Sequence, residues 1–401
     1  MQRAGRIDYP LLLITLLLVS IGLIAVLTAG IPVGYRYEDD PYAHVRSQVK
    51  WVVLGLVLLL VISRIDYHWY ARLDRVALLL VFVTLLAVYA PVVGHPIRGV
   101  RRWIMVGPVQ AQPSELAKVG LVIYLAVSMV RKRQVIESFL KGFLPYFLII
   151  GMVFLLVVGE PDLGSALILG ILGCILMYAG GVRIRHLLYA GVLAGVAVYF
   201  AVCEVGYRQD RILAFMSPES DPQGIGYQPL HLMMSLGAGG WWGVGPGRGH
   251  TKLHYLPTPH TDSIFAVLGE EFGFVGTTVV VCLFGLLAYR GYCIARKASD
   301  SLGRLLALGF CCLICVQALI NMGVATVLLP TTGTPLPLVS YGGSAMLVNL
   351  TAIGVLLSIS RHAGHADRQR LDDSSTPTNE CGSDNSLLPK SGQGNANGRG
   401  D

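Results

Sequence analysis

Ten stretches of the sequence are apolar enough to lie in the hydrocarbon of a lipid bilayer. A helix needs about 20 mostly apolar residues to cross it, because its backbone polar groups find no water there. The chain of 401 residues is 54% hydrophobic and only 14% charged, which excludes a water-soluble domain. We therefore predict an all-α polytopic membrane protein with about ten transmembrane helices. The predicted spans are 9–30, 49–63, 76–93, 116–130, 143–158, 163–180, 187–205, 274–289, 305–327 and 344–359.

The basic residues between the spans predict the orientation of the chain, because cytoplasmic loops are enriched in Lys and Arg. With the N-terminus inside, the inner loops contain Arg64, Arg72, Arg75, Arg131, Lys132, Arg133, Lys141, Arg183, Arg185, Arg290, Arg296, Lys297 and Arg304. The short outer loops contain Arg36, Arg46, Lys50, Arg98, Arg101 and Arg102. Both termini are then predicted to be cytoplasmic.

Residues 1–361 are predicted to form one integral-membrane domain. It includes a long polar loop at about 206–262, which lies outside under this topology and is too long for an idle connection. The tail, 362–401, is rich in Ser, Asn, Gly and Asp. We expect it to be a disordered cytoplasmic segment, because it has too few apolar residues to form a core.

Four segments on the predicted outer side contain residues that are costly to keep near a membrane. Intramembrane and membrane-edge ionisable groups are rare and usually functional, and these four fall on one side of the bilayer. They therefore predict a site at the outer face. The segments are Arg101 to Lys118, the turn Glu160 to Gly164, the end of the long loop at His260-Thr261-Asp262, and Pro330 to Gly343.

Each segment also has a purely structural interpretation. Glu115 and Lys118, three residues apart on one helix face, form an ion pair in that interpretation. Asp162 caps the following span, and Asp262 caps a helix over 263–272. Tyr341-Gly342-Gly343 is simply a turn in this interpretation. Their convergence on one side favours function over these alternatives.

Other motifs carry less weight. His231, His250, His254 and His260 have no tight metal-ligand spacing, so a metal site remains unassigned. The glycines between Gly237 and Gly249 resemble a phosphate cradle but lack the Gly-Lys-Ser/Thr ending of a nucleotide-binding loop. The net charge of +7 is spread over loops, which gives no basis for a nucleic-acid partner.

The C-terminal third contains a long motif that is specific to one family. The sequence reads QALIN at 317–321 and LPTTGTPLPLVSYGGS at 329–344. Further matching motifs follow the same order: RW at 102–103, QPSE at 112–115, PDLG at 161–164, YRQDR at 207–211 and LPTPHTD at 256–262. Over residues 9–361 the chain resembles the FtsW/RodA/SpoVE family of peptidoglycan glycosyltransferases, and it looks closest to FtsW. It departs from the family at Thr258, usually Glu, and at Ser263, usually Phe.

The resemblance implies ten transmembrane helices, a large extracytoplasmic loop and polymerisation of lipid II, the undecaprenyl-pyrophosphate-linked disaccharide peptide, in the bacterial cytoplasmic membrane. It implies that Asp262 is catalytic, as the base for an inverting displacement. The residues expected to bind substrate or pyrophosphate are Arg101, Arg102, Glu115, Lys118, Asp162, Arg208, Arg211 and Lys252. A divalent cation, Mg²⁺ or Mn²⁺, is an alternative source of positive charge.

The resemblance also implies partners. These are a class B penicillin-binding transpeptidase and other membrane proteins of the division or elongation machinery. Septal synthesis during cell division is the preferred process, with RodA-type elongation as an alternative. A lipid II flippase is the rival activity, because ten spans with buried charges also describe a carrier.

Overall fold

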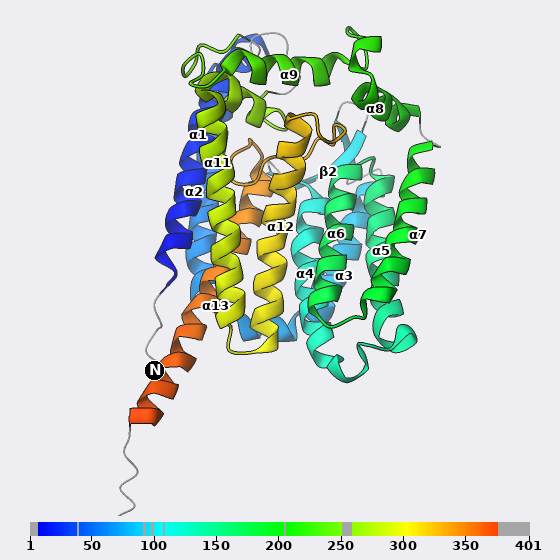
Figure 1. The fold of residues 1–401 in the computed structure, drawn as a ribbon, viewed down its shortest axis with the longest axis vertical. Coiled ribbons are helices and arrows are strands. Elements are labelled where there is room, and N and C mark those ends of the chain that lie inside the picture. The colour runs from blue at the N-terminus through cyan, green and yellow to red at the C-terminus, as the bar shows by residue number, and fades with distance from the viewer. Residues whose placement is uncertain are drawn as a thin grey trace, which may run out of the picture.

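The computed structural model describes residues 7–37, 40–90, 94–97, 100–106, 109–203, 206–250 and 259–375. Figure 1 shows a bundle of long helices with two shorter ones, α8 and α9, lying across one end. The α-helices are α1 (Tyr9–Tyr37), α2 (Ala43–Arg64), α3 (Asp74–Tyr89), α4 (Pro113–Arg131), α5 (Leu144–Gly159), α6 (Leu163–Ala179), α7 (Ile184–Cys203), α8 (Gly206–Met216), α9 (Tyr227–Gly239), α11 (Ile264–Lys297), α12 (Ser301–Ala325) and α13 (Gly343–Ser375). Short helical turns are η1 (Tyr67–Arg72), η2 (Arg133–Val135), η3 (Phe139–Phe143) and η4 (Pro218–Ser220).

Each predicted span falls on one of these helices, which confirms the polytopic α-helical fold. Within the described residues, seven helices are long and apolar enough to cross a membrane. α6 (Leu163–Ala179) and the part of α7 from Ile184 to Val196 are apolar but shorter, and α3 has 16 residues. The count of ten spans stays a prediction.

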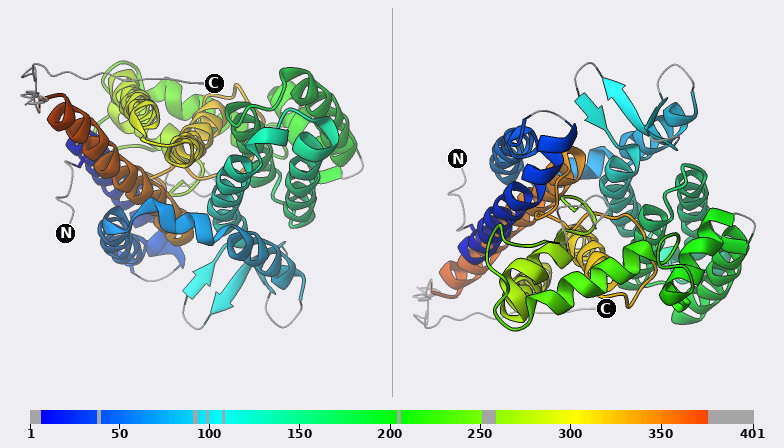
Figure 2. Two further views of the ribbon diagram at one scale, coloured as in Figure 1. Left: turned by 90° about the horizontal axis from the view of Figure 1, so that it is seen from below. Right: turned by 90° about the horizontal axis from the view of Figure 1, so that it is seen from above.

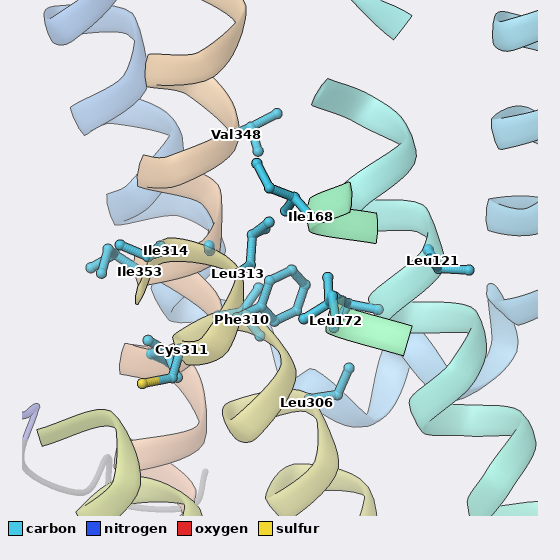
Figure 3. Close-up of a cluster of buried hydrophobic side chains, with 14 of the residues drawn as sticks. Leu121, Ile168, Leu172, Leu306, Phe310, Cys311, Leu313, Ile314, Val348 and Ile353 are labelled. Carbon is cyan, nitrogen blue, oxygen red and sulfur yellow. The ribbon is translucent and has the colours of Figure 1, made fainter. Parts of the chain in front are cut away.

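The core of the bundle lies where α4, α6, α12 and α13 meet (Figure 3). Phe310 and Leu313 of α12 are fully buried there, beside Ile168 and Leu172 of α6. A Cβ atom at Gly309 would lie 2.6 Å from a side-chain carbon of Val122. Small residues at such contacts let membrane helices pack closely, since lipid provides no hydrophobic drive between them.

One small sheet interrupts the helical pattern. β1 (Gly94–Ile97), β2 (Val100–Val106) and β3 (Val109–Ala111) form an antiparallel meander at the periphery of the bundle (Figure 2). Long apolar runs do not predict this sheet, because its strands are short and lie in the connection between two spans. β3 leads directly to the start of α4, where several candidate residues lie.

The two ends of the bundle differ. α8 and α9 lie at one end, whereas the start of α1 and the end of α13 lie at the other (Figure 1). The described helices of the long loop, α8 and α9, therefore lie at the opposite end of the bundle from the start of α1 and the end of α13, and the side of the membrane on which each end lies stays a prediction. α13 continues past His362 to Ser375, and residues 376–401 of the predicted tail lie outside the described residues.

Two irregular segments reach into the bundle. α11 is interrupted at Gly273, whose φ of 66° and ψ of −163° are not helical. The loop 330–343 packs against α1, since a Cβ atom at Gly22 would lie 2.7 Å from the Cα atom of Val339. Non-helical backbone inside a membrane protein is tolerated where protein buries it or where it borders a cavity.

Candidate active site

Asp262 lies in the turn directly before α11, and two other parts of the chain fix that turn. The side-chain amide of Asn321, on α12, donates to the Asp262 carbonyl at 2.9 Å and to the Thr334 carbonyl at 2.8 Å. The Ser340 hydroxyl donates to the Thr261 carbonyl at 2.6 Å. Asp262 itself is half-buried, and its carboxylate accepts from Thr261 Oγ1 at 3.1 Å. Ser263 occupies the N-cap position of α11, so Asp262 is not the cap of this helix.

An aromatic cluster supports the same turn from α2. The rings of His44, His260 and Tyr341 have pairwise centroid separations of 4.5 to 5.4 Å. The Tyr341 amide donates to the His260 carbonyl at 2.9 Å. Gln48, also on α2, donates to the Ser340 carbonyl at 3.2 Å and accepts from the backbone at 342 at 3.2 Å. The loop 330–343 is therefore held between the Asp262 turn and α2.

Glu115 and Lys118 form a buried ion pair at the start of α4. Lys118 Nζ lies 2.6 Å from Glu115 Oε1, and the side chains are 0% and 1% exposed. Lys118 also donates to Gln317 Oε1 at 3.3 Å, and Gln317 donates to the Pro335 carbonyl at 3.1 Å. This pair is therefore connected to the loop that holds the Asp262 turn. Pro113 occupies the first turn of α4, the position where a missing N–H costs nothing.

Among the described side chains of this region, Glu115 Oε2, Asn321 Oδ1 and both carboxylate oxygens of Glu160 are buried without a hydrogen-bond partner. Buried polar atoms in proteins are nearly always paired, with protein or with water. Orphan acceptors near a carboxylate are therefore sites where water or a ligand hydroxyl can donate.

Asp162 connects α6 to the beginning of α4. It caps α6 by accepting from the Ser165 amide at 3.1 Å. Its other oxygen accepts from Gln112 Nε2 at 3.1 Å and from the Ser114 hydroxyl at 3.2 Å. The capping interpretation is thus geometrically correct, and the same carboxylate positions the helix that carries Glu115.

Arg102 lies against the same acidic turn. Its Nε donates to the Glu160 carbonyl at 3.0 Å, and its Nη2 donates to the Pro161 carbonyl. The Glu160 side chain is 1% exposed. Burial and the neighbouring charge of Asp162 raise the pKa of Glu160 to about 8, against the opposing effect of Arg102.

Of the remaining predicted cations, Arg211 has a described side-chain contact near the site. Arg211, on α8, donates to the Thr331 carbonyl at 2.7 Å, which brings it to the loop 330–343. Arg101 and Arg208 belong to β2 and α8. Lys252 and Thr258 lie outside the described residues. Among the side chains that the structure describes, no group of three or more His, Cys, Asp or Glu residues is arranged to hold a metal ion.

Sequence reasoning did not select Gln317 and Asn321 as site residues, although both make the contacts that join the site. The available signal was their polarity within the apolar run of α12, where a polar side chain needs a specific partner. The sequence motif containing Gln112 and Ser114 likewise does not predict their contacts with Asp162. Their partner Asp162 is about 50 residues away in the sequence, as the separations of 50 and 48 show.

The sequence matches a known protein family over most of its length. The model of the FtsW, RodA and SpoVE family, described as a cell cycle protein, matches residues 9–365. The chain belongs to this family. A probable peptidoglycan glycosyltransferase FtsW from Trichlorobacter lovleyi is 39% identical over 89% of this chain and 94% of its own length. Stage V sporulation protein E of Bacillus subtilis is 37% identical over 89% and 97%.

Solved structures of family members share the fold. A chain from a structure of a peptidoglycan synthase complex, described as coordinating polymerization and crosslinking, matches with a TM-score of 0.72 and 29% identity over 89% of this chain and 98% of that one. The rod shape determining protein RodA of Thermus thermophilus matches with a TM-score of 0.60 and 28% identity over 89% and 97%. The chain is thus a multi-pass membrane protein of the FtsW/RodA/SpoVE family.

Proposed function

We propose that this protein is a peptidoglycan glycosyltransferase that polymerises lipid II at the outer face of the bacterial cytoplasmic membrane. Relatives at 39% and 38% identity over most of the chain are named probable peptidoglycan glycosyltransferase FtsW, which supports the proposal. The observation that carries the proposal is that the loop 330–343 is connected to both groups of candidate residues. Asn321 bonds this loop to the Asp262 turn. Gln317 bonds it to the buried pair of Glu115 and Lys118.

In this proposal Asp262 is the general base. The carboxylate takes the proton of the acceptor sugar's hydroxyl as that oxygen forms a bond to the donor's anomeric carbon. The bond from this carbon to the lipid pyrophosphate breaks, and the pyrophosphate leaves with the electron pair. A single displacement inverts the anomeric configuration. The pyrophosphate linkage is already activated, so the step needs no ATP.

The departing pyrophosphate needs positive charge. Preorganised cations stabilise developing negative charge most effectively in a site that excludes water. We assign this task to the cationic residues that the sequence predicts for the outer face and, as an alternative supply of charge, to a divalent cation, Mg²⁺ or Mn²⁺. The cations are Arg101, Arg102, Lys118, Arg208, Arg211 and Lys252.

The decisive experiment measures glycan polymer from purified protein and lipid II in the presence of the transpeptidase partner. Asp262→Ala should keep membrane insertion and lose the polymer. Asp210→Ala is the matched control, because Asp210 is an exposed carboxylate on α8 in the same outer loop. Near-normal polymer from Asp262→Ala would remove this residue from the mechanism.

A lipid II flippase is the second candidate. The interruption of α11 at Gly273 and the inward loop 330–343 favour it, because discontinuous helices are typical of carriers. The same preparation distinguishes the two activities. A flippase moves lipid II across a proteoliposome membrane and makes no polymer from it.

The biological setting is also proposed. We expect septal synthesis with a class B penicillin-binding transpeptidase and other division proteins, with RodA-type elongation as the alternative. Depletion in cells separates these processes, because loss of septal synthesis gives filaments and loss of elongation gives spheres.

The proposed reaction requires Asp262 to face the outside of the cell. In a chain without its native cysteines, Ser217→Cys and Thr332→Cys should react with an impermeant thiol reagent in intact spheroplasts. Ser299→Cys, between α11 and α12, should react only after lysis. The reverse pattern would place the site in the cytoplasm and contradict the proposal.

A further inference from the structure

The interruption of α11 separates backbone groups that would bond to each other in a continuous helix. In such a helix each amide donates to the carbonyl four residues earlier. After the break, the Phe274 amide donates instead to the Gly240 carbonyl at 2.8 Å. The Val275 amide donates to the Trp241 carbonyl at 3.2 Å. Both acceptors belong to the turn 240–245, which begins directly after α9.

The same turn also pairs the carbonyls that the break releases. The Val244 amide donates to the Glu270 carbonyl at 2.9 Å. The Gly245 amide donates to the Glu271 carbonyl at 3.1 Å. The turn therefore lies in the gap of α11 and bonds to the helix on both sides of the break.

Glycine permits this close approach. Gly243 has a φ of 81°, in the region that favours glycine. A Cβ atom at Gly243 would lie 2.2 Å from the Glu271 carbonyl oxygen. A Cβ atom at Gly273 would lie 2.4 Å from the Gly243 amide nitrogen. Part of the glycine-rich sequence between Gly237 and Gly249 thus fits the break in α11.

The turn also presents two tryptophans at the surface of the bundle. The side chains of Trp241 and Trp242 are 69% and 81% exposed. The Trp241 ring packs edge-on against the Phe274 ring, with 5.2 Å between the centroids, and Phe274 is itself exposed. Because the predicted span 274–289 begins at Phe274, the tryptophans lie beside the point where α11 enters that span. α9 lies across this end of the bundle (Figure 1).

The surroundings of the two tryptophans suit the boundary between lipid head groups and hydrocarbon. Trp is enriched at that boundary, because its large apolar ring carries one polar N–H group. Residues 222–247 contain no Asp, Glu, Lys or Arg, although they belong to a loop between spans. The exposed apolar surface continues along α11 at Val275 and Val279, within the predicted span. The backbone bonds between the turn and α11 favour the same location, since lipid tolerates polar backbone groups only when they are paired.

We propose that the turn 240–245 binds phospholipid at the membrane boundary through Trp241 and Trp242, and that it holds the break in α11 at that depth. The first part of α11 runs from the Asp262 turn to the break, so the lipid contact also sets the depth of the Asp262 turn. This inference concerns contact with ordinary bilayer lipid and does not depend on the proposed reaction.

The test uses proteoliposomes of phosphatidylcholine whose acyl chains carry bromine, which quenches the fluorescence of tryptophans that it contacts. The chain has five tryptophans. The signal of Trp241 and Trp242 is therefore taken as the difference between the parent and the double variant Trp241→Phe with Trp242→Phe. Both side chains are exposed, so we expect the double variant to fold. The difference signal should lose most of its intensity in brominated lipid, and bromine near the head group should quench it more than bromine near the chain end.

Two results would overturn the inference. One is a difference signal that brominated lipid leaves unchanged at both depths. The other is a signal that changes only when the transpeptidase partner is added, which would assign this surface to a protein.

Gly243→Ala tests the connection between the break and the lipid contact. Its Cβ atom would collide with the Glu271 carbonyl, so we expect the turn to leave the gap and the quenching to weaken. Gly247→Ala is the matched control. Gly247 has a φ of 78°, and within the described residues a Cβ atom there would meet no atom within 4 Å. The backbone strain is thus similar and only the collision differs. Equal quenching in the two folded variants would show that the break does not position the tryptophans, and the proposed coupling would be wrong.

Discussion

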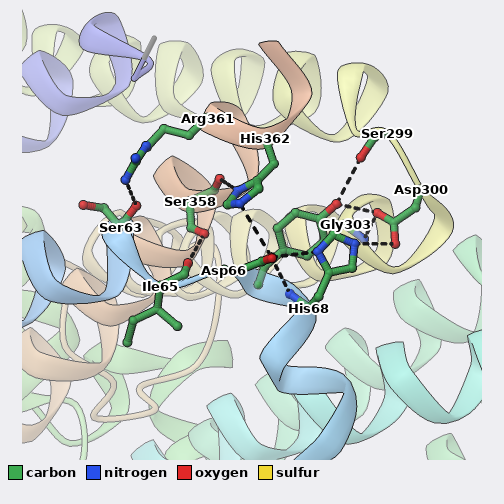
Figure 4. A network of polar contacts seen from close by, with 11 residues as sticks. Ser63, Ile65, Asp66, His68, Ser299, Asp300, Gly303, Ser358, Arg361 and His362 are labelled. Atoms are coloured by element: carbon green, nitrogen blue, oxygen red, sulfur yellow. Dashed lines mark hydrogen bonds and ion pairs between the residues drawn. The ribbon is translucent and has the colours of Figure 1, made fainter. Parts of the chain in front are cut away.

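Two polar regions lie at opposite ends of the bundle, and they are built differently. The candidate site is joined to the start of α2 through Gln48. The opposite cluster, which comprises Asp66, Tyr67, His68, Ser299, Asp300 and His362, lies just beyond the end of α2 (Figure 4). From Gln48 to Asp66 is about 27 Å at 1.5 Å per helical residue. The site contains the buried Glu115 and Lys118 pair and acceptors without a described partner, whereas the cluster is partly exposed and its carboxylates have several partners.

The cluster illustrates a structural use of polar groups. His68 Nδ1 lies 2.7 Å from Asp66 Oδ1, and the Tyr67 hydroxyl donates to Asp300 at 2.7 Å and contacts Ser299 at 3.1 Å. These bonds fasten η1 to the turn between α11 and α12. The side chains of His68 and Asp66 are 52% and 45% exposed, so water screens their attraction and its contribution to stability is small.

One carboxyl from each region shows the same contrast. Burial raises the pKa of Glu160 to about 8, and Asp162 adds to the effect. At Asp66, burial also acts to raise the pKa, but hydrogen bonds from the His68 amide and ring outweigh it, and the pKa is lowered. Hydrogen bonds therefore have the larger effect on the pKa of Asp66, whereas burial has the larger effect on the pKa of Glu160. The predictions below test this difference, from the largest expected effect to the smallest.

The largest effect is expected at the buried ion pair. Lys118→Met leaves the Glu115 carboxylate buried without its partner, which costs about 3–5 kcal/mol of folding free energy. The double variant Glu115→Gln with Lys118→Met removes both charges and should recover most of that stability. We expect neither variant to polymerise lipid II. Thermal unfolding and polymer yield are measured together.

This pair of measurements separates function from folding. If the double variant is stable and keeps normal specific activity, Glu115 and Lys118 form only a structural ion pair.

Asn321 is expected to have the next largest effect. Asn321→Ala removes the donor that joins the Asp262 and Thr334 carbonyls. We expect stability to fall by about 1–3 kcal/mol, since a buried carbonyl loses its partner. The displaced Asp262 turn should lower kcat about 10- to 100-fold, because an error of about 1 Å in position has effects of that size.

Thr326→Val is the matched control for Asn321, since the Thr326 hydroxyl, within the described part of the chain, bonds to carbonyls of α12, at Met322 and Gly323. A normal kcat in a folded Asn321→Ala protein would show that the turn is positioned without this amide.

Glu160 should have a smaller effect on polymerisation than Asn321, and its effect on stability should depend on pH. Its pKa in the folded protein is raised above the unfolded value, so the folded state binds more protons between about pH 4.5 and pH 8. The contribution of Glu160 to stability is then present at low pH and lost as the pH rises toward 8. Glu160→Gln should match the parent near pH 5 and melt at a higher temperature near pH 9. Parallel melting curves across this range would contradict the raised pKa.

The sequence predicts some of these features and not others, for physical reasons. The apolar spans follow from the bilayer, which demands long runs of one composition, and each falls on a helix. The position of Glu115 and Lys118 on one helix face follows from helical spacing alone. The junction at Gln317 does not, because its partner Lys118 is 199 residues away. The helix over 263–272 and the predicted span over 274–289 leave residue 273 between them, and the structure has non-helical backbone there, at Gly273.

The smallest effect is expected from His68 in the opposite cluster. His68→Ala removes the ring contact to Asp66 and the longer one of 3.7 Å to Asp300. Because these groups are about half exposed, we expect a loss of no more than about 1 kcal/mol, which high salt should reduce further. Asp300 keeps its bonds to Tyr67 and to the Gly303 amide, so the turn between α11 and α12 should persist. Polymerisation should proceed at the parental rate, since the substitution lies a helix length away from Asp262. A severe loss of polymer from a stable His68→Ala protein would show that the two ends of the bundle are coupled. The opposite cluster would then contribute to the reaction as well as to stability.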